Sequence, residues 1–288
     1  MKKIKKAVIP VAGFGTRFLP ATKAQPKEML AIIDKPVIQY IVEEMVDSGI
    51  EEIILVTGQG KRAIEDHFDQ NKSLEVHLER NNKIKELEEI RHLSEMAYFV
   101  YLRQKGPYGN ATPVLNVEKL IGSEPFVFAF GDDLIKGEVP ATKQMMEVFY
   151  KYQSPVIGVT QVAEEKVHRY GVIDGEKVED RVYKVKDIVE KPLPKDAPSN
   201  LAVAGRYIFT PDIFEAVKKT EIGKGGELWL ADAVDLLLTQ RDFYAYQYQG
   251  RYYDCGNKLE FLKAIVDFAL EREEFKEEFK NYLKNLKI

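Results

Sequence analysis

The sequence predicts an α/β protein whose mainly parallel sheet carries helices on both faces, in three layers. Apolar runs of strand length alternate with helical patterns along the chain, and no low-complexity linker or internal repeat separates them. The 288 residues are 45% hydrophobic and 31% charged, which is enough to bury a large core. We therefore expect one domain or two tightly packed halves.

The elements follow one another in a regular order. Strands are expected at 6–12, 51–58, 97–102, 126–130, 154–162, 182–190, 201–210 and 243–250, and helices at 34–49, 60–68, 140–152, 211–219 and 228–239. The polar segment 69–95 predicts an exposed helical excursion. The last segment, 257–288, predicts a helix with an apolar stripe, for which core packing is favoured over an oligomer contact; the stripe comprises Leu259, Leu262, Ile265, Val266 and Ala269.

Composition excludes several classes of protein. A formal net charge of -4 argues against a general binder of nucleic acid or of membrane surfaces. The single Cys255 excludes an intrachain disulfide, and the four histidines show no metal-ligand spacing. The apolar run 7–12 is short and contains Pro10, so it predicts a strand rather than a signal peptide or membrane span. We expect a cytoplasmic protein.

The stretch "AGFGTRFLPATKAQPKEM" at 12–29 is a candidate phosphate-binding loop. Two prolines prevent a continuous helix, while Gly13 and Gly15 allow backbone N–H groups to approach an anion closely. The loop follows the first strand, at the edge where open α/β sheets place ligands. Arg17 and Lys27 can donate charge-assisted hydrogen bonds to phosphate oxygens. The spacing fits neither a Walker loop nor the dinucleotide fingerprint.

A second candidate is the acidic pair that follows the apolar strand "FVFAF". Asp132 is aimed out of the carboxyl edge of the sheet, where hard oxygen ligands suit Mg²⁺. Asp133 is the weaker candidate for a metal ligand. Asp254, in "YYDCG", is either a further metal ligand or a turn aspartate before Gly256.

Seven ordered blocks resemble the bacterial UTP–glucose-1-phosphate uridylyltransferases, within the sugar-1-phosphate nucleotidyltransferase superfamily. They are "GFGTRFLPATKAQPKEM", "GIEEIILVTGQGKRAIEDHFD", "GDD", "HRYGVID", "VEKP", "APSNLAVAGRYIFTPDIF" and "YYDCGNKLEF". The resemblance implies a Rossmann-like nucleotidyltransferase fold in one domain. A nucleotide-binding half at about 1–133 and a sugar-phosphate-binding half at 134–256 would enclose the active site, with a helical segment at 257–288.

The resemblance also implies an activity and its partners. Glucose 1-phosphate attacks the α-phosphorus of UTP in an Mg²⁺-dependent in-line displacement, which gives UDP-glucose and pyrophosphate. We expect a homodimer or homotetramer that binds neither nucleic acid nor membrane. The same chemistry with dTTP or another hexose 1-phosphate is the alternative, and a non-catalytic sugar-nucleotide sensor is a third reading. Retention of Arg17, Lys27, Asp132 and Lys191 together argues against the sensor.

The same resemblance implies roles for individual residues. Arg17, Lys27 and Lys191 are the expected catalytic cations, the first two on the triphosphate and the third on the sugar phosphate. The nucleotide is expected to contact Ala12, Gly13, Gly15, Thr16, Glu28, Gln104 and Gly109, with Glu28 reading the pyrimidine edge. The sugar phosphate is expected to contact Gly171, Glu190, Lys191 and Val203. The metal ligands are expected to be Asp132 and Asp254, whereas Asn200 and Tyr207 are expected to be scaffold.

Two stretches depart from the family pattern. Where the family continues its base-contact glycine as G-L-G-H-A-V, this chain has "GNATPV" at 109–114. Where the family has E-I-Q-L-T-D, this chain has "ELWLAD" at 227–232, with Trp229 and Ala231 in place of polar residues. The first departure bears on base preference, and the second bears on sugar choice or subunit packing.

Overall fold

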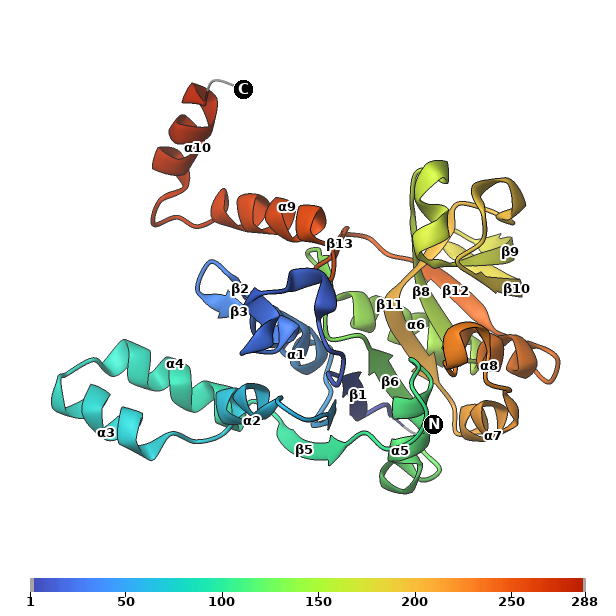
Figure 1. Cartoon of the computed structure of the whole chain (residues 1–288), viewed down its shortest axis with the longest axis horizontal. Coiled ribbons are helices and arrows are strands. Elements are labelled where there is room, and N and C mark those ends of the chain that lie inside the picture. Colours follow the sequence, from blue (N-terminus) through green and yellow to red (C-terminus); the bar gives the residue numbers. More distant parts are fainter. Residues whose placement is uncertain (1–2, 287–288) are drawn as a thin grey trace.

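The computed structural model describes residues 3–286, which fold around one nine-stranded sheet (Figure 1). Its strand order is β5-β4-β1-β6-β11-β8-β12-β10-β9. The strands are β1 Lys6–Pro10, β4 Glu52–Thr57, β5 Tyr98–Arg103, β6 Phe126–Ala129, β8 Val156–Gln161, β9 Gly171–Glu179, β10 Val182–Glu190, β11 Leu201–Phe209 and β12 Tyr244–Gln247. Two small sheets pair β7 Asp133–Lys136 with β13 Arg251–Asp254, and β2 Ala31–Ile32 with β3 Lys35–Pro36.

The sheet is mixed, which corrects the prediction of a mainly parallel one. Strands β5, β4, β1 and β6 are parallel neighbours, as is the pair β12 and β8. Strand β11 runs antiparallel to both β6 and β8, and β10 runs antiparallel to β12 and β9. The tight connection between β9 and β10, with Arg181 at φ 60°, can only produce an antiparallel pair, because parallel neighbours need a long crossover.

Helices cover both faces of the sheet, as predicted (Figure 1). Alternate residues of β1 point to opposite cores, since Ala7 and Ile9 belong to one buried cluster and Val8 to the other. The first cluster contains apolar side chains of α1 Val37–Asp47 and α6 Ala141–Tyr152. The second contains those of α5 Thr112–Ile121, α7 Asp212–Lys219 and α8 Leu230–Leu238. The sheet therefore lies between two separate cores.

Sequence reasoning missed helix α5, strand β9 and the short strands β2, β3, β7 and β13. Helix α5 begins within "NATPV", which is typical of a loop, but its Pro113 lies in the first turn, where a missing backbone N–H costs nothing. Strand β9 has a charged, exposed second half that hides its strand character. Short 3-10 turns complete the described fold: η1 Thr16–Phe18, η2 Ala21–Lys23, η3 Lys27–Met29, η4 Glu164–Arg169, η5 Pro194–Asp196 and η6 Lys224–Gly226.

Two helical segments project from the body (Figure 1). The predicted excursion is confirmed as α3 Lys72–Arg80 and α4 Ile84–Glu95, which follow α2 Arg62–Phe68. The C-terminal segment forms α9 Lys258–Ala269 and α10 Lys276–Asn285. Core packing was the wrong prediction for Leu259 and Leu262, which are 59% and 58% exposed, because α9 packs through the face that carries Phe261, Ile265 and Phe268. Across residues 3–286, every helix is too short or too polar to cross a membrane.

Candidate active site

The loop after β1 is built from three short turns instead of a helix, as its prolines predict. Gly15 adopts φ 66°, a left-handed conformation that glycine takes without strain. The Thr22 hydroxyl donates a hydrogen bond of 2.7 Å to the Gly15 carbonyl and closes the turn. Residues 12–29 therefore form a folded loop at the carboxyl end of β1.

Lys27, at the end of this loop, reaches the acidic pair that follows β6. Its Nζ lies 2.5 Å from Oδ2 of Asp132. The residue predicted to bind phosphate and the residue predicted to bind metal thus form an ion pair with each other. Burial opposes the charge of Lys27, but the carboxylates of Asp132 and Glu28 outweigh burial, and the pKa of Lys27 is raised. The lysine stays protonated and available for an anionic ligand.

Glu28 forms a buried ion pair that sequence reasoning missed. Lys61 Nζ donates to Glu28 Oε2 at 2.9 Å, and the two side chains are 6% and 0% exposed. The other carboxylate oxygen, Oε1, is buried without a hydrogen-bond partner among the residues described. Burial raises the pKa of Glu28, and Lys27 and Lys61 oppose that rise. No sequence signal marks Lys61 as buried, because a lysine before a polar helix is normally exposed.

Most of the predicted nucleotide contacts meet in one cavity of about 320 Å³. The wall includes Ala12, Gly13, Lys27, Glu28, Gln104 and Gly109. Gly15 and Thr16 belong to the same loop, 12–29, but they are not among the described residues that line this cavity. The aromatic residues Phe14, Tyr108 and Trp229 also line the cavity and were not predicted to do so. Phe14 and Tyr108 have ring centroids 6.1 Å apart, so they form an aromatic pair in this wall.

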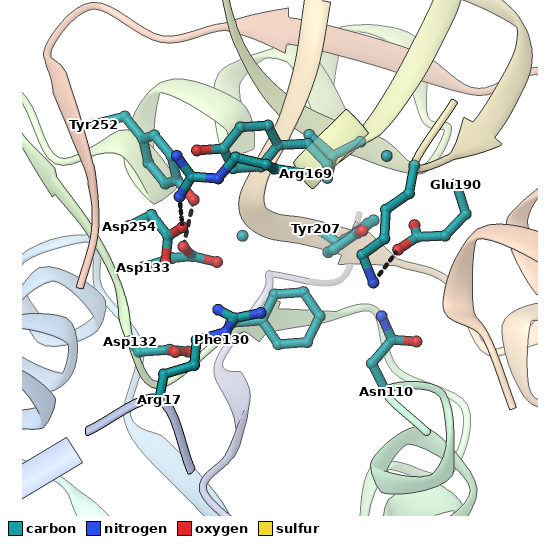
Figure 2. A pocket seen from close by; sticks show the side chains of 15 residues that line it. Arg17, Asn110, Phe130, Asp132, Asp133, Arg169, Glu190, Tyr207, Tyr252 and Asp254 are labelled. Atoms are coloured by element: carbon teal, nitrogen blue, oxygen red, sulfur yellow. Dashed lines mark hydrogen bonds and ion pairs between the residues drawn. The ribbon is translucent and has the colours of Figure 1, made fainter. Parts of the chain in front are cut away.

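A second cavity, of about 180 Å³, shares lining residues with the first, and Figure 2 shows the side chains that line it. The predicted residues in its wall are Arg17, Asp132, Gly171, Glu190, Lys191, Val203 and Asp254. Asn110, Phe130 and Asp132 line both cavities. Tyr207, expected to be scaffold, also lines the second cavity, whereas Asn200 is not among its described lining residues. Arg17, expected on the triphosphate, thus lines the second cavity and not the first. The other predicted nucleotide and sugar-phosphate residues in these walls face adjoining spaces that share three described lining residues.

One side of the second cavity is strongly acidic. Figure 2 shows the carboxylates of Asp132, Asp133 and Asp254 gathered there, across from Glu190 and Asn110. Burial, followed by the charges of Asp132 and Asp254, raises the pKa of Asp133 to about 8, and the Tyr252 hydroxyl donates a hydrogen bond to it. Burial and Asp132 also raise the pKa of Asp254, despite an opposing ion pair with Arg169 at 2.8 Å. Arg169 lies in the quoted block "HRYGVID" but was not singled out.

This acidic side fits a hard divalent cation. Within residues 3–286, no set of three or more His, Cys, Asp or Glu side chains is arranged to hold a metal alone. Magnesium commonly takes one or two carboxylates from the protein and its other ligands from phosphates and water. Asp132 and Asp254 can supply carboxylate oxygens in that way. A bound cation would relieve the repulsion between their two negative charges.

The opposite side of the cavity carries Lys191. Its Nζ lies 3.1 Å from Glu190 Oε1 and 4.2 Å from the centre of the Trp229 ring. A Cβ at Gly171 would lie 3.3 Å from Glu190 Oε2, so the glycine leaves room for that carboxylate. A single cation thus faces both a carboxylate and an indole at this end of the cavity.

The two stretches that depart from the family pattern contact each other. We use the name latch for the segments that make this contact, residues 108–111 and 227–230, which overlap the two stretches. Leu228 N donates to the Tyr108 carbonyl at 2.8 Å, and Ala111 N donates to the Leu228 carbonyl at 3.1 Å. Asn110 Oδ1 accepts from Leu230 N at 2.7 Å, at the start of α8. A Cβ at Gly109 would lie 2.1 Å from the Leu228 carbonyl oxygen, so only glycine fits there.

A model of the nucleotidyl transferase family matches residues 6–271. The chain belongs to this family. Among its relatives, the UTP–glucose-1-phosphate uridylyltransferase of Bacillus subtilis (strain 168) is 49% identical over 286 residues, which cover 99% of this chain and 98% of that one. The predicted resemblance is confirmed.

Solved structures of relatives also superpose on this family member over nearly its whole length. A UDP-glucose pyrophosphorylase complexed with UDP-glucose is 45% identical, with a TM-score of 0.86 over 94% of this chain and 100% of that one. A UTP-bound UGPase from Acinetobacter baumannii is 38% identical, with a TM-score of 0.91 over 99% of this chain and 100% of that one. The nucleotidyltransferase fold is therefore common to these proteins.

Proposed function

We propose that this protein transfers the uridylyl group of UTP to glucose 1-phosphate. The observation that carries the proposal is the pair of adjoining cavities, one lined by the predicted nucleotide residues and the other by the predicted sugar-phosphate residues, with Asp132 in both walls. An oxygen of the sugar phosphate attacks the α-phosphorus of UTP and forms the new P–O bond. The bond from the α-phosphorus to the β-phosphate breaks, and pyrophosphate leaves. Relatives 49% and 48% identical carry the name of this activity.

The nucleotide side supplies charge and orientation. Lys27 gives up its contact with Asp132 and turns to the triphosphate, where Arg17 adds a second cation. Glu28, Gln104 and the backbone at Ala12, Gly13 and Gly109 surround the base. Cancelling the repulsion between two phosphorylated substrates and holding them in line is the main catalytic requirement of such a displacement.

Asp132 and Asp254 are proposed to hold Mg²⁺, since divalent cations are general in enzymes of this kind. When bound, the ion neutralises charge that develops on the reacting phosphates. Asp132 is released for this role when Lys27 engages the triphosphate. Arg169 keeps the Asp254 carboxylate oriented through its ion pair.

Lys191 is proposed to bind the phosphate of glucose 1-phosphate, and Glu190 to accept hydrogen bonds from the sugar hydroxyls. Gly171 and Val203 line the same cavity and contribute backbone contacts. On this assignment residues 1–133 form the nucleotide-binding half, 134–256 the sugar-binding half and 257–288 the C-terminal helical segment. We also propose a homodimer or homotetramer, with the exposed Leu259 and Leu262 of α9 as candidate contact residues.

A matrix of pyrophosphate-release assays tests this function. It crosses UTP, dTTP, CTP, ATP and GTP with the 1-phosphates of glucose, galactose, mannose and N-acetylglucosamine, at one Mg²⁺ concentration. We expect the highest kcat/KM for UTP with glucose 1-phosphate. A higher value for dTTP would move the function to thymidylyl transfer. No turnover in any cell of the matrix would favour a sugar-nucleotide sensor.

A further inference from the structure

Lys191 has a constrained backbone and a partly exposed side chain with two partners. Its N–H donates to the Tyr170 carbonyl at 3.0 Å, and its φ of 47° lies in the left-handed region. The side chain beyond this point is 43% exposed. Its direction therefore depends on the two groups that face the ammonium, the Glu190 carboxylate and the Trp229 ring.

Trp229 is held in place by its neighbours in the latch. Leu228 on one side makes two backbone hydrogen bonds, one to Tyr108 and one from Ala111. Leu230 on the other side donates to the Asn110 side chain. The indole lines the nucleotide cavity, while its face receives the ammonium of Lys191 from the sugar-phosphate cavity. The ring therefore stands at the border between the two cavities on a rigid support.

We propose that Trp229 is a positioning residue for the sugar phosphate, because its indole face holds the Lys191 ammonium at the border between the two cavities. An arriving sugar 1-phosphate then meets an oriented cation instead of a mobile one. A glutamine, which the family pattern has at this position, offers no aromatic face to an ammonium. The inference rests on the proposed function and adds a residue that the reaction chemistry alone would not identify.

The kinetic test compares Trp229→Leu with Trp229→Phe, which keeps an aromatic face. A cation–π contact at a partly exposed site corresponds to about a two- to fivefold effect on binding. We expect Trp229→Leu to raise the KM for glucose 1-phosphate by about that factor while kcat stays within about twofold, since Lys191 itself is present. Trp229→Phe should restore most of the loss. Equal KM values in the two variants would overturn the proposal, because lost volume alone would then explain them.

A spectroscopic test leaves the latch intact. Trp229 is the chain's single tryptophan, so fluorescence excited selectively at the indole reports this residue alone. We expect Lys191→Met to change the emission of the free protein, and the matched control Lys195→Met, at an exposed lysine of η5, to leave it unchanged. Titration with UDP-glucose should shift the wild-type emission and shift that of Lys191→Met less.

Unchanged emission in Lys191→Met would contradict the contact and overturn the proposal. Failure of the proposed function would look different. Wild-type protein would then release no pyrophosphate from UTP and glucose 1-phosphate, although Lys191→Met would still change the emission.

Discussion

The two lysines proposed to bind phosphate sit in contrasting surroundings. Lys27 is 22% exposed and paired with Asp132 at 2.5 Å, inside a network that includes the buried pair of Glu28 and Lys61. Lys191 is 43% exposed and is directed by Glu190 and an aromatic ring. The comparison shows two ways of orienting a cation: a network of buried carboxylates and lysines on the proposed nucleotide side, and one carboxylate with an aromatic ring on the proposed sugar side.

The largest expected effect is at the carboxylate that belongs to both cavities. Asp132→Asn removes one charge from the proposed metal site and weakens the partner of Lys27, so kcat at saturating substrates should fall by about 10²-fold or more. Pyrophosphate release measured across a range of Mg²⁺ concentrations checks this. The exposed Asp180→Asn serves as the control and should retain wild-type turnover. Near-normal kcat for Asp132→Asn at saturating Mg²⁺ would contradict the proposal that Asp132 is a metal ligand.

Breaking the buried pair on the nucleotide side should destabilise the fold. Lys61→Met leaves Glu28 buried without its ion-pair partner, and such a loss costs about 3–5 kcal/mol. Urea unfolding of the variant measures the change in the free energy of unfolding. The neighbouring Arg62→Met removes an exposed cation and should stay within about 0.5 kcal/mol of wild type. Similar free energies of unfolding for both variants would mean that the buried pair of Lys61 and Glu28 does not stabilise the nucleotide side.

The two lysines can be separated by UTP binding in the absence of sugar. Lys27→Ala removes a charge-assisted contact and should weaken UTP binding about 10- to 100-fold, whereas Lys191→Ala should change it by less than about twofold. Calorimetric titration with UTP and Mg²⁺ gives both dissociation constants. Equal losses would show that the phosphates are assigned to the wrong lysines.

The smallest expected effect concerns the base. Uracil and thymine differ by one methyl group, which a pocket wall distinguishes by about 1–3 kcal/mol. We expect UTP to be preferred over dTTP by about tenfold in kcat/KM, with purine triphosphates rejected much more strongly. The physical reason is the cavity wall around Gly109 and Asn110, which hydrogen bonds with Leu228 and Leu230 hold in a fixed shape. Competition between UTP, dTTP and GTP at one Mg²⁺ concentration decides it, and equal values for GTP and UTP would contradict a preformed base pocket.

The sequence was sufficient to predict site residues that come directly after a strand. It was not sufficient to predict contacts between residues that are far apart in the chain. The positions of Lys27 and Asp132 followed from the loop after β1 and the end of β6, but their ion pair depends on how two strands lie side by side. Lys61 and Arg169 were missed because burial and partners come from distant segments. The contact between the two departing stretches was also hidden, since Asn110 and Leu230 are 120 positions apart.

The antiparallel course of β11 has a consequence for the wall of the second cavity. Because β11 runs opposite to β6, the residues that precede Arg206 extend past the point where β6 ends, and Phe130 N still donates to the Gly205 carbonyl at 3.0 Å. The ladder with β8 breaks its register between Val203 and Tyr207, where Gly205 turns at φ 65°. Val203 and Gly205 therefore line the second cavity from within a strand of the main sheet, not from a connecting loop. The amide hydrogens of β11 on either side of this break, which bond to neighbouring strands, should exchange slowly even without substrate, unlike those of an ordinary ligand-binding loop.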